Sequence, residues 1–307
     1  MAQQNNTIAV IGCGLIGQSW AALFAGYGFD VRAWDPAANW QAGFEASVAA
    51  ALEQVRVLRR SAHAEGRIVT TDSLDDAVRG AFWIQENAPE SVPLKIDLYA
   101  RIEAGAEPGA ILASSTSSLT WSELSRQLRH RDRFITAHPF NPPHLMPLVE
   151  VYAADASVRA KAEAFYNGLQ RKTVMLSRDA VGHIANRLAS ALWREAVNIV
   201  DQGIADVSAV DAALVHGPGL RWSVVGAHMA YHLGGGAGGI EHYLEHLGPS
   251  QERRWASLGN PTLTPELCRR IVDGVMQEAA GRSVAQLQAE RDAGLLRALA
   301  ARPGDAS

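Results

Sequence analysis

A short apolar segment that leads directly into a glycine-rich turn constrains the fold of this chain more than any other feature. Residues 8–11 are apolar and mostly β-branched, as in a buried parallel strand. Gly12, Gly14 and Gly17 follow in the spacing G-x-G-x-x-G, and an apolar helical pattern then covers residues 15–26. A strand, such a turn and a helix in this order are typical of the first unit of a doubly wound α/β sheet.

The three glycines and the start of the helix predict a nucleotide site. Gly12 allows the tight turn, Gly14 lets the backbone approach a pyrophosphate, and Gly17 lets helix and strand pack closely. At Leu15 and Ile16, the helix start offers unpaired N–H groups and a partial positive charge to phosphates. The alternative is that these glycines only turn the chain.

Asp35 makes the nucleotide interpretation more specific. It ends the second predicted strand, near the offset of about 20 residues expected for the carboxylate that holds the ribose hydroxyls. An acidic side chain at this place repels a 2′-phosphate, so the sequence predicts NAD rather than NADP. Arg32 lies close in sequence, but its position in the middle of the strand does not by itself favour NADP.

Strand and helix patterns alternate over the first part of the chain, which predicts a mostly parallel sheet with helices on both faces. Further strands are expected at residues 31–35, 68–71, 82–85, 110–113, 134–137, 148–152 and 173–176, and helices at 36–65, 74–78, 93–104, 121–128 and 158–169. Beyond residue 177 only helical spacing is found. The predicted fold class is therefore α/β, a Rossmann-type doubly wound sheet over residues 1–180 followed by an all-α C-terminal domain over residues 181–307.

A histidine and a glutamate flank a proline-rich loop in the sheet domain. His138 follows an apolar strand, so it should lie at the carboxyl edge of the sheet, where ligands bind in open α/β folds. Glu150 lies on the returning strand, close enough in sequence to fold back against His138. Such a pair can take a proton from an alcohol while hydride leaves the adjacent carbon. The same two residues can also form a purely structural ion pair.

Two further polar sites accompany this pair. Residues 114–118 read SSTSS after another strand, so their hydroxyls can bond a substrate oxygen or cap the next helix, for which Thr120 is also available. Asn186 lies on an apolar helical face and is either a satisfied buried polar group or a ligand contact.

Composition excludes several other classes of function. The net charge of −4 leaves no electrostatic footprint for nucleic acid or an anionic membrane. No apolar run reaches the roughly 18 residues of a membrane-spanning helix, and the polar N-terminus shows no signal peptide. Cys13 and Cys268 have no metal-ligand or disulfide spacing, and no metal site is expected from the histidines. We expect a soluble cytoplasmic protein.

Taken together, the motifs resemble the L-3-hydroxyacyl-CoA dehydrogenase family. The matching segments, in the family's order, are the glycine-rich turn, SSTSSL at 114–119, HPFNP at 138–142, LVEV at 148–151 and GHIANR at 182–187. The match covers nearly the whole chain, and the combination is far more specific than any one segment.

The resemblance implies roles for the residues at the matching positions. His138 is the expected catalytic base and Glu150 its partner, Ser117 binds the reacting oxygen, and Asn186 completes the site from the helical domain. Family members are typically dimers formed through the helical domain, so residues 181–307 are expected to serve substrate binding and dimerisation.

Two further residues match family positions near the nicotinamide ribose of NAD. They are Glu90 and Lys95, in the segment PESVPLK. The resemblance therefore places them with the cofactor-binding residues.

Within the family, the chain looks closest to the branch that acts on small hydroxy acids without CoA, namely the L-carnitine and L-gulonate 3-dehydrogenases, the latter also known as lambda-crystallin. Residues 40–65 are short of lysine, whereas CoA-dependent members carry a lysine-rich arm there. The leading expectation is NAD-dependent oxidation of L-carnitine to 3-dehydrocarnitine.

The far end of the substrate is the least determined part of this hypothesis. Arg221 can pair with a substrate carboxylate, and Trp222 beside it belongs to a set of aromatic residues that can recognise a trimethylammonium group. Aromatic residues at helical spacing can equally be core or dimer interface. The alternatives are an acyl-CoA or L-gulonate dehydrogenase and, more remotely, a non-catalytic NAD-binding protein like the crystallin.

Overall fold

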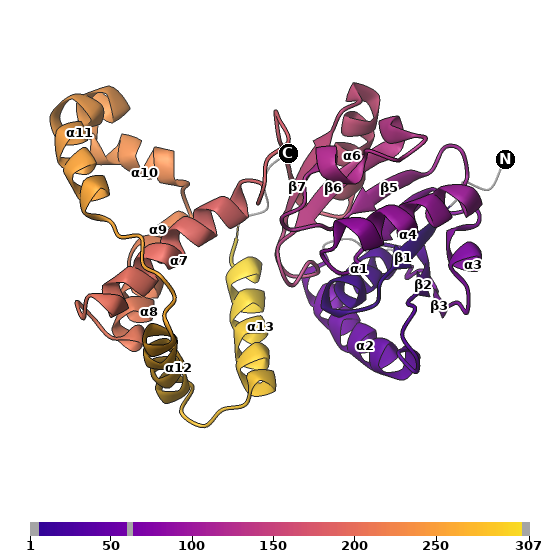
Figure 1. Cartoon of the computed structure of the whole chain (residues 1–307), viewed down its shortest axis with the longest axis horizontal. Coiled ribbons are helices and arrows are strands. Elements are labelled where there is room, and N and C mark those ends of the chain that lie inside the picture. The colour runs from indigo at the N-terminus through magenta and orange to yellow at the C-terminus, as the bar shows by residue number, and fades with distance from the viewer. Residues whose placement is uncertain (1–5, 60–63, 303–307) are drawn as a thin grey trace. The chain divides into compact units, whose positions relative to one another are not determined.

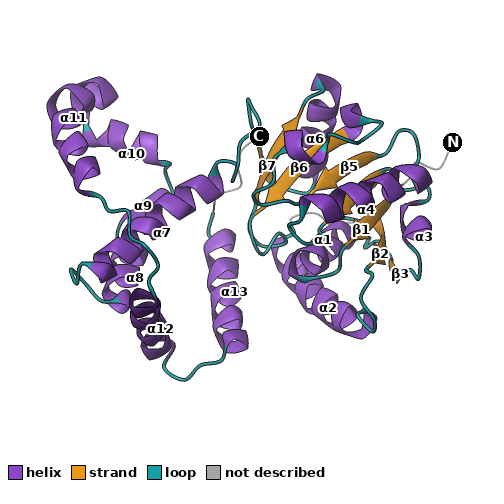
Figure 2. Cartoon of the chain, in the orientation of Figure 1, coloured by secondary structure: helices purple, strands orange, loops and turns teal. Residues whose placement is uncertain are grey.

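The computed structural model describes residues 6–59 and 64–302 (Figures 1 and 2). The described residues fall into two compact units, one within residues 1–186 and 290–307 and the other of residues 187–289. The boundary at residue 180 and the roles of the two predicted domains stay predictions.

An eight-stranded sheet forms the centre of the first unit, in the order β3-β2-β1-β4-β5-β6-β7-β8. Its strands are β1 (Thr7–Ile11), β2 (Asp30–Trp34), β3 (Ile68–Thr70), β4 (Trp83–Glu86), β5 (Ile111–Ser114), β6 (Phe134–Pro139), β7 (Leu148–Ala153) and β8 (Lys172–Met175). All neighbouring strands are parallel except β6 and β7, which are antiparallel. The predicted fold class is confirmed.

Alternate residues of the central strands serve two separate cores. In β1, Ile8 and Val10 face the core formed with α1 (Leu15–Gly26), α2 (Gln41–Leu58) and α6 (Ala156–Gly168). Ala9 and Ile11 face the other core, formed with α3 (Leu74–Val78), α4 (Val92–Gly105) and α5 (Trp121–Leu124). Because every residue in the strand interior is apolar, both faces of the sheet can be covered by helices.

Most predicted elements lie within one or two residues of the observed ones, with two clear exceptions. The helix expected over residues 121–128 is α5, which ends at Leu124. Thr120 caps this helix in a capping box with Glu123, as its sequence position allowed. Leu128 lies in the turn region after α5 and is buried there. The apolar pattern that predicted a longer helix therefore extends past the end of α5. The described residues of 36–65 contain one helix, α2, while residues 60–63 lie outside the described part of the chain.

The second unit is helical, and no strand occurs among its residues, all of which the structure describes. Its helices are α7 (Ala185–Asp201), α8 (Val207–His216), α9 (Pro218–Trp222), α10 (Ala227–Gly234), α11 (Gly239–Ser257) and α12 (Pro265–Ala279), and α13 (Val284–Ala300) leads on to the C-terminal end. No helix in the described ranges has both the length and the apolar character needed to cross a membrane.

Candidate active site

The glycine-rich turn between β1 and α1 has a different steric reason for each glycine. Gly12 has a φ of +88°, and a Cβ there would lie 2.8 Å from the backbone of Asn87. A Cβ at Gly17 would lie 1.9 Å from the carbonyl oxygen of Gly12. A Cβ at Gly14, in contrast, would meet nothing within 4 Å. Gly12 and Gly17 are therefore required by the fold itself, while Gly14 borders open space of the kind that a pyrophosphate needs.

Asp35 lies directly after β2 and holds this turn through its carboxylate. Its Oδ2 accepts the N–H of Cys13 at 2.8 Å and its Oδ1 accepts the N–H of Ala37 at 2.9 Å. Each oxygen keeps a lone pair for a ribose hydroxyl. Arg32 donates to the carbonyls of Asp76 and Arg79, so its guanidinium is engaged away from this carboxylate.

Cys13, within the turn, is a buried thiol. Burial is the largest cause that raises the pKa of the thiol, and the negative charge of Asp35 raises this pKa further. The thiol is therefore protonated and fills a small space in the core.

A pocket of about 430 Å³ opens in the first unit at the carboxyl ends of β4, β5 and β6. It brings together five of the residues predicted from the sequence, namely Ile16, Glu90, Ser117, His138 and Asn186. Parallel strands present their carboxyl ends at one edge, which explains why these residues from distant parts of the chain meet there.

His138 and Glu150 face each other across the antiparallel pair of β6 and β7. The imidazole Nδ1 lies 2.9 Å from Oε2 of the carboxylate, and the two side chains are 6% and 1% exposed. Because a carboxylate can only accept, Nδ1 carries the proton and Nε2 presents a lone pair. Nε2 lies 3.4 Å from the amide nitrogen of Asn186, at the pocket.

The other oxygen of Glu150 is bound by the chain before α7. Oε1 accepts the N–H groups of Ile184 at 2.7 Å and Ala185 at 2.9 Å. Burial raises the pKa of Glu150, but the hydrogen bonds from His138, Ala185 and Ile184 outweigh burial and leave the pKa below its ordinary value. Glu150 is therefore ionised and orients His138.

Ser117 and Glu90 also line the pocket and contact each other. The Ser117 hydroxyl donates to Glu90 at 2.9 Å, and the Ser117 N–H donates to the same oxygen. The Thr116 hydroxyl donates to Glu90 at 2.9 Å. Burial raises the pKa of Glu90, yet these bonds from Ser117 and Thr116 hold it below its ordinary value. Glu90 is thus a charged anchor for the segment that carries Ser117.

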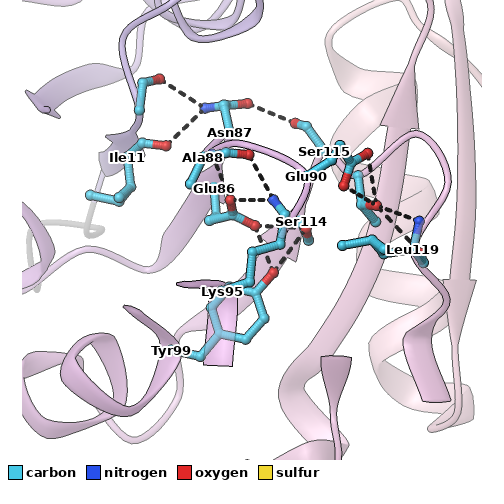
Figure 3. A network of polar contacts seen from close by, with 12 residues as sticks. Ile11, Glu86, Asn87, Ala88, Glu90, Lys95, Tyr99, Ser114, Ser115 and Leu119 are labelled. Atoms are coloured by element: carbon cyan, nitrogen blue, oxygen red, sulfur yellow. Dashed lines mark hydrogen bonds and ion pairs between the residues drawn. The ribbon is translucent and has the colours of Figure 1, made fainter. Parts of the chain in front are cut away.

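Lys95 does not line the pocket. Its ammonium donates to Glu86 Oε1 at 2.6 Å and to the carbonyl of Ala88 at 2.9 Å, with the side chain only 1% exposed. Glu86 also accepts the hydroxyls of Tyr99 at 2.6 Å and Ser114 at 2.7 Å (Figure 3). Lys95 therefore stabilises the backbone between β4 and Glu90 through Ala88, without lining the pocket itself.

Arg221 and Trp222 lie in α9 of the second unit, and both are exposed. Their prediction as substrate-binding residues stays a prediction.

Three residues of the site were not singled out from the sequence. Asn87 lies at the end of β4, where it accepts the Ser115 hydroxyl at 2.7 Å, and its position at a strand end was the available signal. Phe140 lines the pocket and follows His138 by two residues. The ring of His183 stacks on that of His138, with centroids 5.0 Å apart and planes inclined by 14°.

Comparison with known proteins assigns the chain to a family. The model of the 3-hydroxyacyl-CoA dehydrogenase NAD-binding domain matches residues 7–180, and that of the C-terminal domain of the same enzymes matches residues 182–264. The chain belongs to the 3-hydroxyacyl-CoA dehydrogenase family. The resemblance seen in the sequence is thereby confirmed, and the chain is an NAD-dependent oxidoreductase.

Individual relatives match over nearly their whole length. L-carnitine dehydrogenase of Streptomyces coelicolor is 41% identical over 301 residues, which cover 96% of this chain and 94% of that one. L-carnitine dehydrogenase of Nocardiopsis dassonvillei is 42% identical, covering 94% and 89%. Among solved structures, 5-formyl-3-hydroxy-2-methylpyridine 4-carboxylic acid 5-dehydrogenase, described as an NAD+-dependent dismutase, is similar with a TM-score of 0.83 at 26% identity, covering 97% and 99%.

Proposed function

We propose that this enzyme oxidises the 3-hydroxyl of L-carnitine to the ketone, 3-dehydrocarnitine, with NAD as hydride acceptor. One observation carries the chemistry: Nε2 of the His138–Glu150 pair lies at the same pocket as Ser117 and Asn186, and this pocket opens next to the glycine-rich turn. The choice of carnitine is supported by full-length relatives at about 40% identity that bear that name.

The residues present fit NAD. Gly14 leaves room for the pyrophosphate, and no acidic residue lies in the first turn of α1, so the N–H groups at Leu15 and Ile16 meet no competing charge there. Asp35 is proposed to hold the ribose, and Glu90 lies at the pocket. When bound, NAD supplies the nicotinamide ring that accepts a hydride from the substrate carbon.

His138 is proposed to be the general base. The substrate hydroxyl points at Nε2 and gives it a proton as the C–H bond breaks, so the alcohol carbon becomes a carbonyl carbon. The resulting imidazolium is stabilised by the ionised Glu150, which stays hydrogen-bonded at Nδ1. The proton is then released to solvent when the ketone leaves.

Ser117 and Asn186 are proposed to orient the reacting oxygen. Both line the pocket, and the Asn186 amide also donates to the carbonyl of Ser117 at 3.1 Å, which fixes one residue against the other. Positioning of this kind raises the fraction of bound substrate in a reactive geometry. Arg221 and Trp222 are proposed for the carboxylate and the trimethylammonium group of carnitine.

We propose further that the enzyme acts in the cytoplasm, where NAD is at hand, and as a homodimer. Support for the dimer comes from large apolar side chains exposed on the second unit, including Trp193 (55%) of α7 and Met276 (61%) of α12. Exposed apolar surface of this kind marks interaction sites.

The test is a kinetic panel followed by one substitution. L-carnitine, L-gulonate and 3-hydroxybutyryl-CoA are compared by NADH absorbance, and the proposal requires the largest kcat/KM with L-carnitine. A preference for the CoA ester would replace it with an acyl-CoA dehydrogenase. Tight NAD binding without turnover of any member would favour a non-catalytic protein.

The His138→Ala variant should then lower kcat by about 10²–10⁴-fold, the usual contribution of a general base, while NADH binding measured by fluorescence is retained. His130→Ala, at an exposed histidine outside the pocket, is the matched control. Near-normal turnover by His138→Ala would end the assignment of the base.

A further inference from the structure

We propose that His183 is a positioning residue of the reaction, whose ring fixes both the tilt of His138 and the distance between His138 and the segment carrying Ser117. The inference rests on the proposed function in so far as His138 is the base. It concerns a side chain that is buried, does not itself line the pocket, and is not needed to explain proton transfer itself.

The backbone at this position is held in an uncommon conformation. Gly182 has a φ of +74° and His183 a φ of +49°. A left-handed conformation is ordinary for glycine but costs free energy for a side chain as large as histidine, and it persists only where the surroundings enforce it. The turn directs the next two N–H groups, of Ile184 and Ala185, to Glu150. We name residues 182–186 the clip, since their backbone binds the Glu150 carboxylate that is hydrogen-bonded to His138.

The contacts of the His183 ring determine its tautomer. Its Nε2 lies 3.2 Å from the carbonyl oxygen of Thr116, which can only accept, so Nε2 carries the proton. Its Nδ1 then bears a lone pair and is buried without a hydrogen-bond partner among the described residues. An unsatisfied buried nitrogen costs free energy, so the hydrogen bond to Thr116 does not by itself explain a histidine at this place. The ring also makes a near-parallel stack on His138, with centroids 5.0 Å apart.

The stack supplies a constraint that Glu150 alone cannot give. The hydrogen bond at Nδ1 by itself would leave the His138 ring able to tilt about the line to Glu150 Oε2, and the 3.4 Å contact of Asn186 at Nε2 is long for a hydrogen bond. Any tilt moves Nε2 away from the substrate oxygen. A parallel ring against one face prevents that tilt. General-base catalysis needs the base within hydrogen-bond reach of the proton it takes, so a tilt slows the reaction without weakening substrate binding.

The clip also binds the segment that carries Ser117. His183 donates to the carbonyl of Thr116, and Asn186, three residues later, donates to the carbonyl of Ser117 at 3.1 Å. Two consecutive carbonyls of the Ser117 segment are thus tied to the turn that binds Glu150. The clip sets the separation between Nε2 of His138 and the Ser117 hydroxyl, the two groups proposed to meet at one substrate oxygen.

The ring must stay neutral to serve in this way. Burial lowers the pKa of His183 most, and the positive charge of His138 lowers it further, while Thr116, Glu150 and Asp179 act in the opposite direction. A charged ring would oppose the charge that His138 acquires during turnover. His183 is therefore a neutral ring when it stacks on His138 during the proposed reaction.

Two variants separate the effect of the ring stack on His138 from that of the hydrogen bond to Thr116. His183→Phe keeps an aromatic ring but removes the bond to Thr116, and should lower kcat about tenfold, or ~1.4 kcal/mol. His183→Asn removes the ring, and should lower kcat by roughly 10²-fold, within the range of a misplaced general base. In both, the KM for NAD should stay within about twofold, and the primary isotope effect with substrate deuterated at the reacting carbon should increase. His130→Phe is the control.

Two results would overturn the proposal. One is a kcat within about twofold of the parent protein in both variants. The other is a loss of activity that follows the melting temperature alone, with the isotope effect unchanged, which would make His183 a stabilising residue and no more.

A substrate-independent measurement distinguishes failure of this inference from failure of the proposed function. In ¹⁵N-histidine NMR of the intact protein, His183 should show the Nε2–H tautomer and take up no proton near its ordinary pKa, and His183→Phe should shift the His138 signals while His130→Phe should not. Titration of His183 as an ordinary histidine would refute the inference, whatever substrate the enzyme uses.

Discussion

Replacing Lys95 with methionine tests whether the pocket depends on a charge pair hidden behind it. The ammonium lies 2.6 Å from Glu86 Oε1, and the two side chains are 1% and 0% exposed. Methionine fills a similar volume without charge. Glu86 would keep the hydroxyls of Tyr99 and Ser114 and the N–H of Ala88, but its negative charge would be left buried without a cation.

The expected loss is large because a buried charge cannot regain water when its partner is removed. Breaking a buried ion pair by removing one partner costs about 3–5 kcal/mol. For a unit of this size, each kcal/mol lowers the melting temperature by roughly 2–4 °C, so Lys95→Met should lower it by about 6–20 °C. The neighbouring segment that ends at Glu90 should loosen with it, and the KM for NAD should increase.

The assay is thermal unfolding by calorimetry with three variants. Arg67→Met removes an exposed ion pair with Asp30, in which the arginine is 85% exposed, and should cost at most about 1 kcal/mol. The double variant Glu86→Gln with Lys95→Met removes both charges and should recover part of the loss. A shift of less than about 2 °C for Lys95→Met, or a double variant no more stable than Lys95→Met, would refute the reasoning.

Two further predictions concern the glycine-rich turn and acid. Gly17→Ala would place a Cβ 1.9 Å from the Gly12 carbonyl oxygen, so it should lower both the melting temperature and the NADH affinity, the latter by more than about tenfold. The control is Gly43→Ala in α2, where a Cβ meets nothing within 4 Å and should stabilise the helix by about 0.5–1 kcal/mol. Equal effects of the two variants in calorimetry and NADH titration would contradict the steric argument. Glu90 and Glu150 have pKa values below the ordinary 4.5, so the stability they contribute is present above that pH and is lost as the pH falls through their lower folded-state values. Urea unfolding should therefore show a shallower loss of stability below pH 4.5 in Glu150→Gln than in the parent protein, and an identical acid dependence would remove Glu150 from this explanation.

Local patterns were sufficient to predict much of this fold. Strand β1 has an unbroken apolar run because helices cover both of its faces, and Gly12 and Gly17 occur where backbone atoms leave no room for a side chain. The pairing of His138 with Glu150 was also predictable, since a strand that returns after a short loop must lie beside the strand before it.

Other features depend on contacts between distant segments, and the sequence alone does not determine them. The apolar spacing after Trp121 looks the same whether Leu128 lies on a helix or in a turn, so the end of α5 was wrong by four residues. Lys95 matches a position near the cofactor, but a lysine nine residues from Glu86 along the chain gives no sign that the two are buried together. His183 stacks on His138 only because the turn at residues 182–183 is left-handed.

The carboxylates around the pocket support the proposal that the base is a histidine. Glu150 is bonded through both oxygens to His138, Ile184 and Ala185. Glu90 is held by the Thr116 and Ser117 segment, and both carboxyls have lowered pKa values, which make them weak proton acceptors. Their charge serves to orient neighbouring groups. This leaves Nε2 of His138, at the described pocket lining, as the group that we propose to accept the proton, and we expect the position of its ring to govern the transfer.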